Sequence, residues 1–190
     1  TNENAYNVVY IDSSKNYTDT NGSVTIDGFR IRGGSTGVNV NNGTICIKNN
    51  RIYESTTGIF VDSSNCEISY NTIENNNNVG LGLMNSNYIV NNNFIVKNSK
   101  GGLVNYGNGR GLISNNVLAK NSGQNIGGGI QLTNPIYVDV INNTIVENGT
   151  INQLGAGLYI KKNTMSGSFI NNVFWKNWNK VGPDTTSSDI

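Results

Sequence analysis

The chain has 190 residues, with 13 basic against 12 acidic side chains, and its formal net charge of +1 excludes the basic surface typical of nucleic-acid binders. No apolar run is long enough for a transmembrane helix, and the first residues lack the basic and apolar regions of a signal peptide. The chain is rich in asparagine and glycine, which are poor helix formers that accept left-handed turns, so the composition favours short strands and many turns.

A short motif recurs along the chain: two asparagines or a close variant, then any residue, then a large apolar residue. The intervals between copies grow from about 21 to about 29 residues toward the C-terminus, which is in the range of solenoid repeats. An earlier copy, one interval before Asn50, has Phe29 in place of the second asparagine. The second asparagines of the copies are Asn50, Asn71, Asn93, Asn116, Asn143 and Asn172.

Two further patterns keep step with this motif. A glycine followed by alternating apolar residues occurs once per repeat, as in Gly58-Ile59-Phe60-Val61. An apolar residue also stands three positions before each repeating asparagine, as Ile68 does before Asn71. Because side chains of a strand alternate between its two faces, each repeat is expected to contain about three short strands.

Repeats of this length with three strands each predict a parallel β-helix. A leucine-rich repeat would need its leucine consensus, a propeller blade needs about 40 residues, and a calcium-binding roll needs a glycine-rich nonapeptide. The sequence therefore predicts one all-β domain, a right-handed parallel β-helix of about seven coils over residues 1–190. Within it, 1–23 form a first partial coil, 24–177 form the repeats and 178–190 form a C-terminal tail.

The repeating asparagines are expected to stack in the core. Equivalent residues of successive coils lie about 4.8 Å apart, and a buried amide is costly unless it is hydrogen-bonded. The stack therefore predicts a structural asparagine ladder with Asn116 in its middle. Asn121, in the adjoining turn, is expected to be more exposed to water. The extra residues of the longer coils, near 122–126 and 149–153, are expected to form surface loops.

The paired motifs, from Ile26 to Phe174, resemble the repeats of the right-handed parallel β-helix superfamily. That superfamily includes pectate lyases, polygalacturonases and sugar-binding surface proteins. The segment Thr25-Ile26-Asp27-Gly28-Phe29-Arg30-Ile31-Arg32-Gly33-Gly34 resembles the opening coil of such repeats in large secreted bacterial proteins. The resemblance implies an extracellular or cell-surface setting and a polysaccharide ligand, but it does not imply an activity, since fold does not fix function.

The residues needed for polysaccharide cleavage do not gather in the predicted coils. The chain has no histidine, and we expect no metal site and no cofactor. Glu67 and Asp139 share one outward row but stand three coils apart, roughly 14 Å at the strand spacing. Glycosidase carboxylates are separated by about 5–9.5 Å. We therefore expect no catalytic residue and favour a non-catalytic chain.

Two sets of outward residues are candidates for binding. Tyr53, Phe60, Tyr159 and Trp175 could stack on sugar rings, while Lys97 and Lys120 could form a basic strip for acidic sugars. An apolar strip is expected on one outer face, where exposed patches indicate interfaces. We expect the C-terminal tail or a neighbouring molecule to cover this strip, which consists of Phe94, Val117, Val173 and Trp175.

The two cysteines differ by one position in their repeats. Cys46 lies four residues before Asn50, whereas Cys66 lies five before Asn71. A shift of one residue turns a side chain to the opposite face of a strand. We therefore expect one thiol to face outward and the other inward, and both to be free.

Taken together, the sequence favours a non-catalytic extracellular β-helix module that binds polysaccharide or serves as a display scaffold. One alternative is a polysaccharide lyase or glycoside hydrolase, or a fragment of one. Another is a purely structural spacer in a surface protein. The expected partners are a polysaccharide and, at the apolar strip or the coil ends, an adjoining domain or another protomer; neither nucleic acid nor a membrane span is expected.

Overall fold

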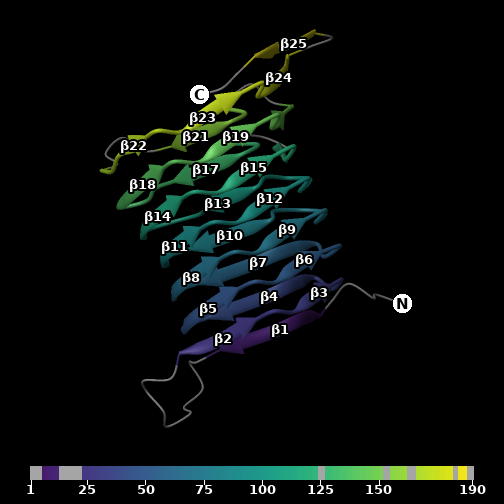
Figure 1. Ribbon diagram of the computed structural model, residues 1–190, viewed down its shortest axis with the longest axis vertical. Helices are drawn as coiled ribbons and strands as arrows, with labels where there is room; N and C mark the ends of the chain where they lie inside the picture. Colours follow the sequence, from purple (N-terminus) through teal and green to yellow (C-terminus); the bar gives the residue numbers. More distant parts are fainter. Residues whose placement is uncertain are drawn as a thin grey trace.

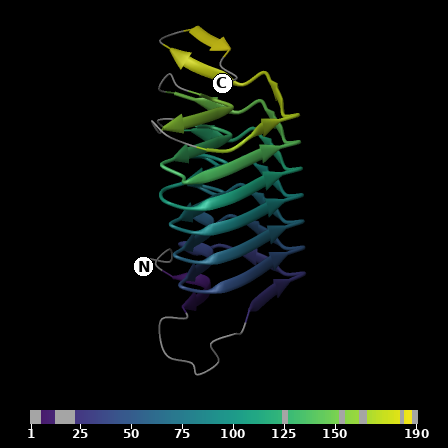
Figure 2. The same cartoon turned by 90° about the vertical axis from the view of Figure 1, so that its left-hand side faces the viewer.

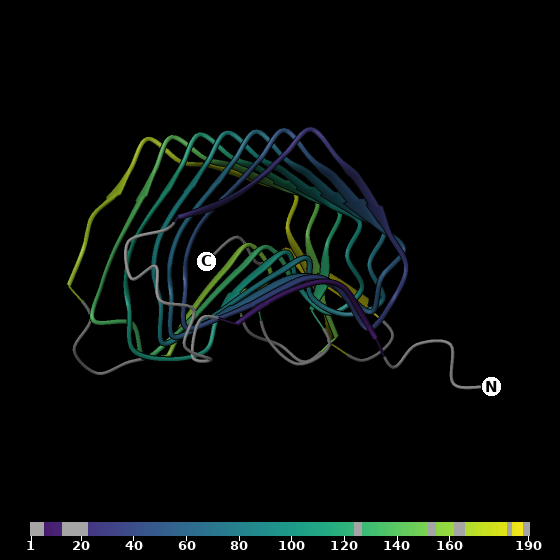
Figure 3. The same cartoon turned by 90° about the horizontal axis from the view of Figure 1, so that it is seen from below.

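The computed structural model describes residues 6–12, 23–123, 127–151, 155–161, 166–181 and 184–187. The chain winds into a stack of similar turns, with strands of successive turns side by side (Figures 1 and 2). Three seven-stranded parallel sheets form the walls, and a view along the axis shows the turns superimposed around one interior (Figure 3). The prediction of an all-β parallel β-helix is confirmed. Within the described ranges, no helix has the length and apolar character needed to cross a membrane.

Each turn passes through the three sheets in the same order. Sheet A contains β1 (Asn7–Asp12), β4 (Thr36–Asn41), β7 (Thr57–Asp62), β10 (Leu81–Met84), β13 (Leu103–Asn105), β17 (Ile130–Thr133) and β21 (Leu158–Lys161). Sheet B contains β2 (Val24–Asp27), β5 (Thr44–Lys48), β8 (Asn65–Ser69), β11 (Asn87–Asn91), β14 (Arg110–Ser114), β18 (Tyr137–Ile141) and β22 (Phe169–Ile170). Sheet C contains β3 (Arg30–Arg32), β6 (Arg51–Tyr53), β9 (Thr72–Glu74), β12 (Phe94–Val96), β15 (Val117–Ala119), β19 (Thr144–Val146) and β23 (Val173–Trp175).

The number of complete turns is smaller than predicted. Five successive turns, from β4 to β19, are each described without an internal break, against the roughly seven coils expected from the sequence. Strands β1–β3 and β21–β23 flank this stack, and each of these sets is interrupted by residues outside the described ranges. The predicted count was higher because it assigned one coil to every copy of the motif, including the copies at both ends of the five described turns.

The core consists of apolar rows that run along the axis. In sheet B, Ile47 is paired with Ile68, which is paired with Val90, and all three are fully buried. This confirms the apolar row predicted three residues before each asparagine. Burying such side chains contributes about 1.5–3 kcal/mol each, so the rows are the main source of stability. The row ends at Phe169, which is 41% exposed because no described strand lies beyond β22.

The predicted asparagine ladder is present and buried. The Asn71 side chain donates to the carbonyl of Ile47 (2.8 Å) and to Oδ1 of Asn93 (3.0 Å). The Asn71 backbone N–H donates to the same Oδ1 atom at 2.9 Å. The Asn71 side chain therefore bonds the backbone of the preceding coil, through the Ile47 carbonyl and the Asn50 N–H, and the asparagine side chain of the next coil.

A second ladder, which the sequence analysis did not predict, follows five residues after the first. Asn121 is 0% exposed and repeats the bonds of its counterparts, donating to the Ile95 carbonyl (2.8 Å) and to Oδ1 of Asn148 (3.0 Å). The expectation that the Asn121 side chain is more exposed to water than that of Asn116 was wrong, because the turn that contains Asn121 also points its side chain into the coil. Ser55 precedes the stack, whose asparagines are Asn76, Asn98, Asn121, Asn148 and Asn177.

The second ladder explains the repeating glycine. A Cβ atom on Gly58 would meet the Gly80 carbonyl oxygen and would lie 2.9 Å from Nδ2 of Asn76 and 2.8 Å from Cγ2 of Ile73. These neighbours are backbone and buried side chains that cannot move away. Glycine is therefore required where the second ladder meets the start of a sheet A strand.

The residue before each ladder asparagine adopts a left-handed conformation. Asn49 has φ of 56° before Asn50, and Lys120 has φ of 58° before Asn121. Asparagine tolerates this region better than most residues, which accounts for the double asparagine at the first corner. The second corner accepts glutamate, asparagine or lysine there, so its sequence pattern is weaker.

The extra residues of the longer coils form strands where loops were expected. Sheet D contains β16 (Ser122–Gly123), β20 (Gly149–Thr150), β24 (Trp178–Val181) and β25 (Asp184–Ser187). Its first three strands are parallel, and β25 pairs antiparallel with β24. The insertions were predicted as loops because each was read alone, whereas equivalent insertions in successive coils can pair with one another. Their remaining residues, 124–126 and 152–153, lie outside the described ranges.

Candidate functional site

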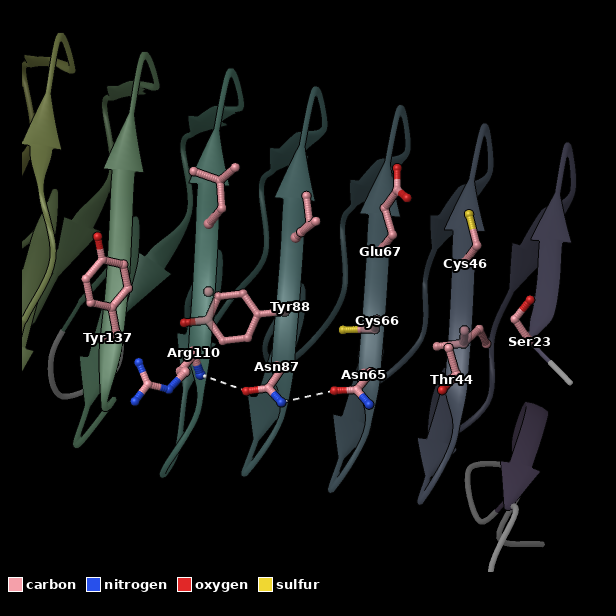
Figure 4. A pocket seen from close by; sticks show the side chains of 14 residues that line it. Ser23, Thr44, Cys46, Asn65, Cys66, Glu67, Asn87, Tyr88, Arg110 and Tyr137 are labelled. Atoms are coloured by element: carbon pink, nitrogen blue, oxygen red, sulfur yellow. Dashed lines mark hydrogen bonds between the residues drawn. The ribbon is translucent and has the colours of Figure 1, made fainter. Parts of the chain in front are cut away.

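A hollow of about 660 Å³ lies along sheet B, where it crosses five strands from β5 to β18 and extends to Ser23, the residue before β2. At the strand spacing of about 4.8 Å, five steps make it roughly 24 Å long. Two rows of side chains run along it, each contributing one residue per strand (Figure 4). The first row is Thr44, Asn65, Asn87, Arg110 and Tyr137. The second row includes Cys46, Glu67, Ile89 and Leu112.

The first row is a chain of polar groups. Nδ2 of Asn87 donates to Oδ1 of Asn65 at 3.0 Å, and the Arg110 backbone N–H donates to Oδ1 of Asn87 at 3.2 Å (Figure 4). The Tyr137 hydroxyl donates to Asp139 Oδ2 at 3.1 Å, and this bond raises the pKa of the tyrosine. The row thus holds its amides in fixed orientations and presents them at the strand spacing.

The second row combines one carboxylate with apolar side chains. Glu67 is exposed, while Ile89 and Leu112 follow it on the next two strands. Glu67 and Arg110 are the charged residues that line the hollow, so its lining charges balance. An elongated hollow with no net lining charge, with amides on one side and apolar groups on the other, suits a ligand with hydroxyl groups and apolar ring faces.

Tyr88 and Gly111 lie beneath the first row. The Tyr88 side chain points into the coil and is almost fully buried, which raises the pKa of its hydroxyl. A Cβ on Gly111 would overlap the Tyr88 ring, so the glycine in the next coil leaves the space that the ring fills. The floor of the hollow is therefore packed and rigid at its centre.

The residues predicted to bind ligand do not come together. Tyr53 and Trp175 lie on the outer face of sheet C, and Phe60 and Tyr159 lie on that of sheet A. None of these four lines the hollow on sheet B. Arg51 lies 4.7 Å from the centre of the Tyr53 ring, so that ring already has a cationic neighbour within the chain.

The two lysines predicted to form a basic strip occupy corner positions. Lys97 and Lys120 each follow a strand of sheet C and have left-handed φ angles of 57° and 58°. Nζ of Lys120 lies 3.4 Å from a carboxylate oxygen of Glu147. Neither lysine lines the hollow, and the salt bridge reduces the positive character of this strip.

The apolar strip on sheet C is exposed in the described chain. Phe94 is 56% exposed, and Val173 and Trp175 are each 53% exposed, while Val117 is half-buried. The Lys176 ammonium lies 4.3 Å from the centre of the Trp175 ring. The described part of the C-terminal tail pairs within sheet D and does not bury these residues, and their cover by a neighbouring molecule stays a prediction.

The two thiols face opposite sides of sheet B, as predicted. Cys46 is half-buried beside the outward Glu67 position, whereas Cys66 fills the inward slot equivalent to Ile45. Burial raises the pKa of Cys66 to about 12, and both thiols are free.

Carboxylates near the hollow are far apart. Glu67 and Asp139 share one row, but three strand steps of about 4.8 Å separate them, which gives roughly 14 Å. Within the described ranges, no cluster of three or more histidine, cysteine, aspartate or glutamate residues is arranged to hold a metal ion. The geometry therefore offers recognition groups along the hollow but no pair of carboxylates at glycosidase spacing.

The sequence pattern pointed to only one of the two rows that line the hollow, the row that contains Glu67 and leads to Asp139. The parallel row, two residues earlier on each strand, was missed. The available signal was the strand period itself. Residues two positions apart on a strand share a face, so Asn65 and Asn87 had to point outward with Glu67 and Ile89.

Comparison with known proteins agrees with this architecture. No curated protein and no solved structure matches the chain significantly. A family model described as a right-handed beta helix region matches residues 7–93 and, in a second alignment, 37–189. Because these matches cover most of the chain, the protein belongs to the right-handed β-helix family.

Proposed function

We propose that this β-helix domain is a non-catalytic module that binds a linear polysaccharide along the hollow on sheet B. The observation that carries the proposal is the pair of side-chain rows, which repeat from strand to strand and run along the axis. A polymer lying in this direction would meet equivalent groups at regular intervals. Display of the binding face outside the cell or at its surface is part of the same proposal.

The chemistry of the rows supports a carbohydrate. Asn65 and Asn87 carry amide donors and acceptors that can bond sugar hydroxyls, and Arg110 adds several donors. Ile89 and Leu112 offer apolar contact to a ring face, and Tyr137 offers an aromatic one. Sugar binding along a preformed rigid surface also limits the entropy lost on binding.

Binding can be tested on a glycan array, followed by calorimetry with the best ligand. An Arg110→Ala change should weaken binding by about 1.5–3 kcal/mol if the guanidinium bonds the ligand directly. Tyr137→Ala should also weaken binding, whereas Tyr70→Ala, which removes an exposed tyrosine outside the hollow, should leave it unchanged. If the array shows no ligand, or if all three variants bind equally, the hollow is not the binding site.

The alternatives have distinct outcomes. A lyase or hydrolase would release products from pectin or alginate, with or without calcium, and the wide separation of Glu67 and Asp139 argues against the acid-pair version. A spacer or display scaffold would bind no glycan and would tolerate every change in the two rows. Product release and array binding therefore separate the three functions.

A further inference from the structure

The chain contains four asparagines that are followed by glycine: Asn21, Asn42, Asn108 and Asn148. Such a pair can modify itself. The glycine backbone nitrogen attacks the asparagine side-chain carbonyl carbon, the bond to the amide nitrogen breaks, and ammonia leaves with the backbone proton. Water then opens the cyclic imide to give aspartate or isoaspartate. The reaction requires a free backbone N–H and a free side-chain amide, so local structure determines where it occurs.

Two of the pairs are locked by hydrogen bonds. Asn148 is fully buried in the second ladder, and the Gly149 N–H donates to the Asn121 carbonyl at 2.8 Å. Asn42 lies at a corner of the surface, but the Gly43 N–H donates to Oγ of Ser64 at 3.0 Å. At both sites the attacking nitrogen is engaged. The pair at 21–22 lies outside the described residues.

Asn108 differs from both. It lies in the corner between β13 and β14, its side chain is exposed, and within the described ranges neither its amide nor the Gly109 N–H has a hydrogen-bond partner. The Gly109 carbonyl accepts from Ile136 and Tyr137, so the residue is anchored while its nitrogen is unengaged. The pairing of β10 with β13 and of β11 with β14 shows that this corner is one residue longer than its counterpart in the preceding coil.

We propose that Asn108 is a site of spontaneous deamidation in the folded protein. The product carboxylate would stand two residues before Arg110, the cation that lines the hollow. Asn108 itself does not line the hollow, so the new negative charge would lie beside a lining whose anion is Glu67 and whose cation is Arg110. The modification itself does not depend on the proposed function; only its effect on ligand binding does.

The test is to incubate the folded chain in mildly alkaline buffer and to map its tryptic peptides by mass spectrometry. The peptide 101–110 should gain about one dalton as the amide becomes an acid, with isoaspartate resolved by fragmentation. Deamidation at Asn108 should be at least about tenfold faster than at Asn42 or Asn148. A local opening of only about 1.4 kcal/mol at the locked sites produces that ratio.

Two controls make the result decisive. In denaturant, Asn42, Asn108 and Asn148 should react at similar rates, since the hydrogen bonds that distinguish them are lost. An Asn108→Gln variant should keep the mass of peptide 101–110 constant during the incubation. The substitution is made at residue 108 and not at Gly109, because a Cβ on Gly109 would meet the Ser86 carbonyl and disturb the fold. Equal rates at the three sites in the folded chain, or faster reaction at Asn42, would overturn the proposal. An absence of glycan binding would leave this test unaffected.

Discussion

Replacing Asn121 by leucine tests whether the second asparagine ladder stabilises the fold. The side chain donates to the Ile95 carbonyl and to Asn148 Oδ1, and its own Oδ1 accepts from the backbone N–H and the side chain of Asn98. Asn121→Leu removes all four bonds. It also places a branched apolar group at a corner where Gly102 lies against the amide.

The expected loss can be estimated from the groups left without partners. The Asn98 N–H and the Ile95 carbonyl both lose the Asn121 side chain in a fully buried corner. An unsatisfied buried polar group costs about 1–3 kcal/mol, so Asn121→Leu should reduce the free energy of unfolding by about 2–6 kcal/mol. Asn116→Leu should cost as much, because the first ladder has the same bonds: Asn116 is 1% exposed and Asn121 is 0% exposed.

Chemical unfolding followed by circular dichroism provides the measurement. The control is Asn65→Leu, which alters an exposed asparagine of sheet B and should change stability by about 0.5 kcal/mol or less. If Asn121→Leu resembles this control while Asn116→Leu is severely destabilised, the second stack is a turn preference and not a structural ladder. If all three variants are as stable as the parent, neither stack acts through buried hydrogen bonds.

Three further predictions concern the glycine, the thiols and the apolar strip. Gly58→Ala should lower the free energy of unfolding by about 1–3 kcal/mol, because its Cβ would meet backbone atoms. Gly82→Ala should cost less, because its Cβ would mainly meet the edge of the Phe60 ring, which can move. Comparing the unfolding midpoints of the two variants tests this difference. Burial raises the Cys66 pKa from 9.0 to about 12, so the unfolded chain loses the thiol proton at a lower pH than the folded chain. The contribution of the buried thiol to stability is therefore complete below about pH 9 and falls by about 1.4 kcal/mol per pH unit as the pH rises toward 12. Cys66→Val should therefore lose less stability than the parent between about pH 9 and 11, and only Cys46 should react with a thiol reagent in the native state. The exposed Trp175 should support self-association at high concentration, with Trp175→Ala shifting sedimentation toward monomer; an unchanged distribution would argue against an interface there.

The sequence by itself determined the repeat, the strand faces and the first ladder. Apolar residues recur at the strand period, and this pattern alone places Ile47 and Ile68 inside and Glu67 outside. The double asparagine marks a corner that needs both a left-handed residue and a buried amide. The left-handed conformation is a local requirement, and the buried amide is required by the equivalent residues of neighbouring coils. Both therefore recur once per repeat and are visible in the sequence.

Only the tertiary structure decided which of the remaining polar residues are buried. Asn121 and Asn65 have similar intrinsic preferences, but one corner turns into the coil beside a glycine and the other residue stands on an outer face. Sheet D likewise depends on insertions that pair with insertions in the next coil. The hollow depends on two rows whose successive members are separated in sequence by a whole coil. These features arise where coils are stacked, because hydrogen bonding and water exclusion there depend on neighbours that no single repeat contains.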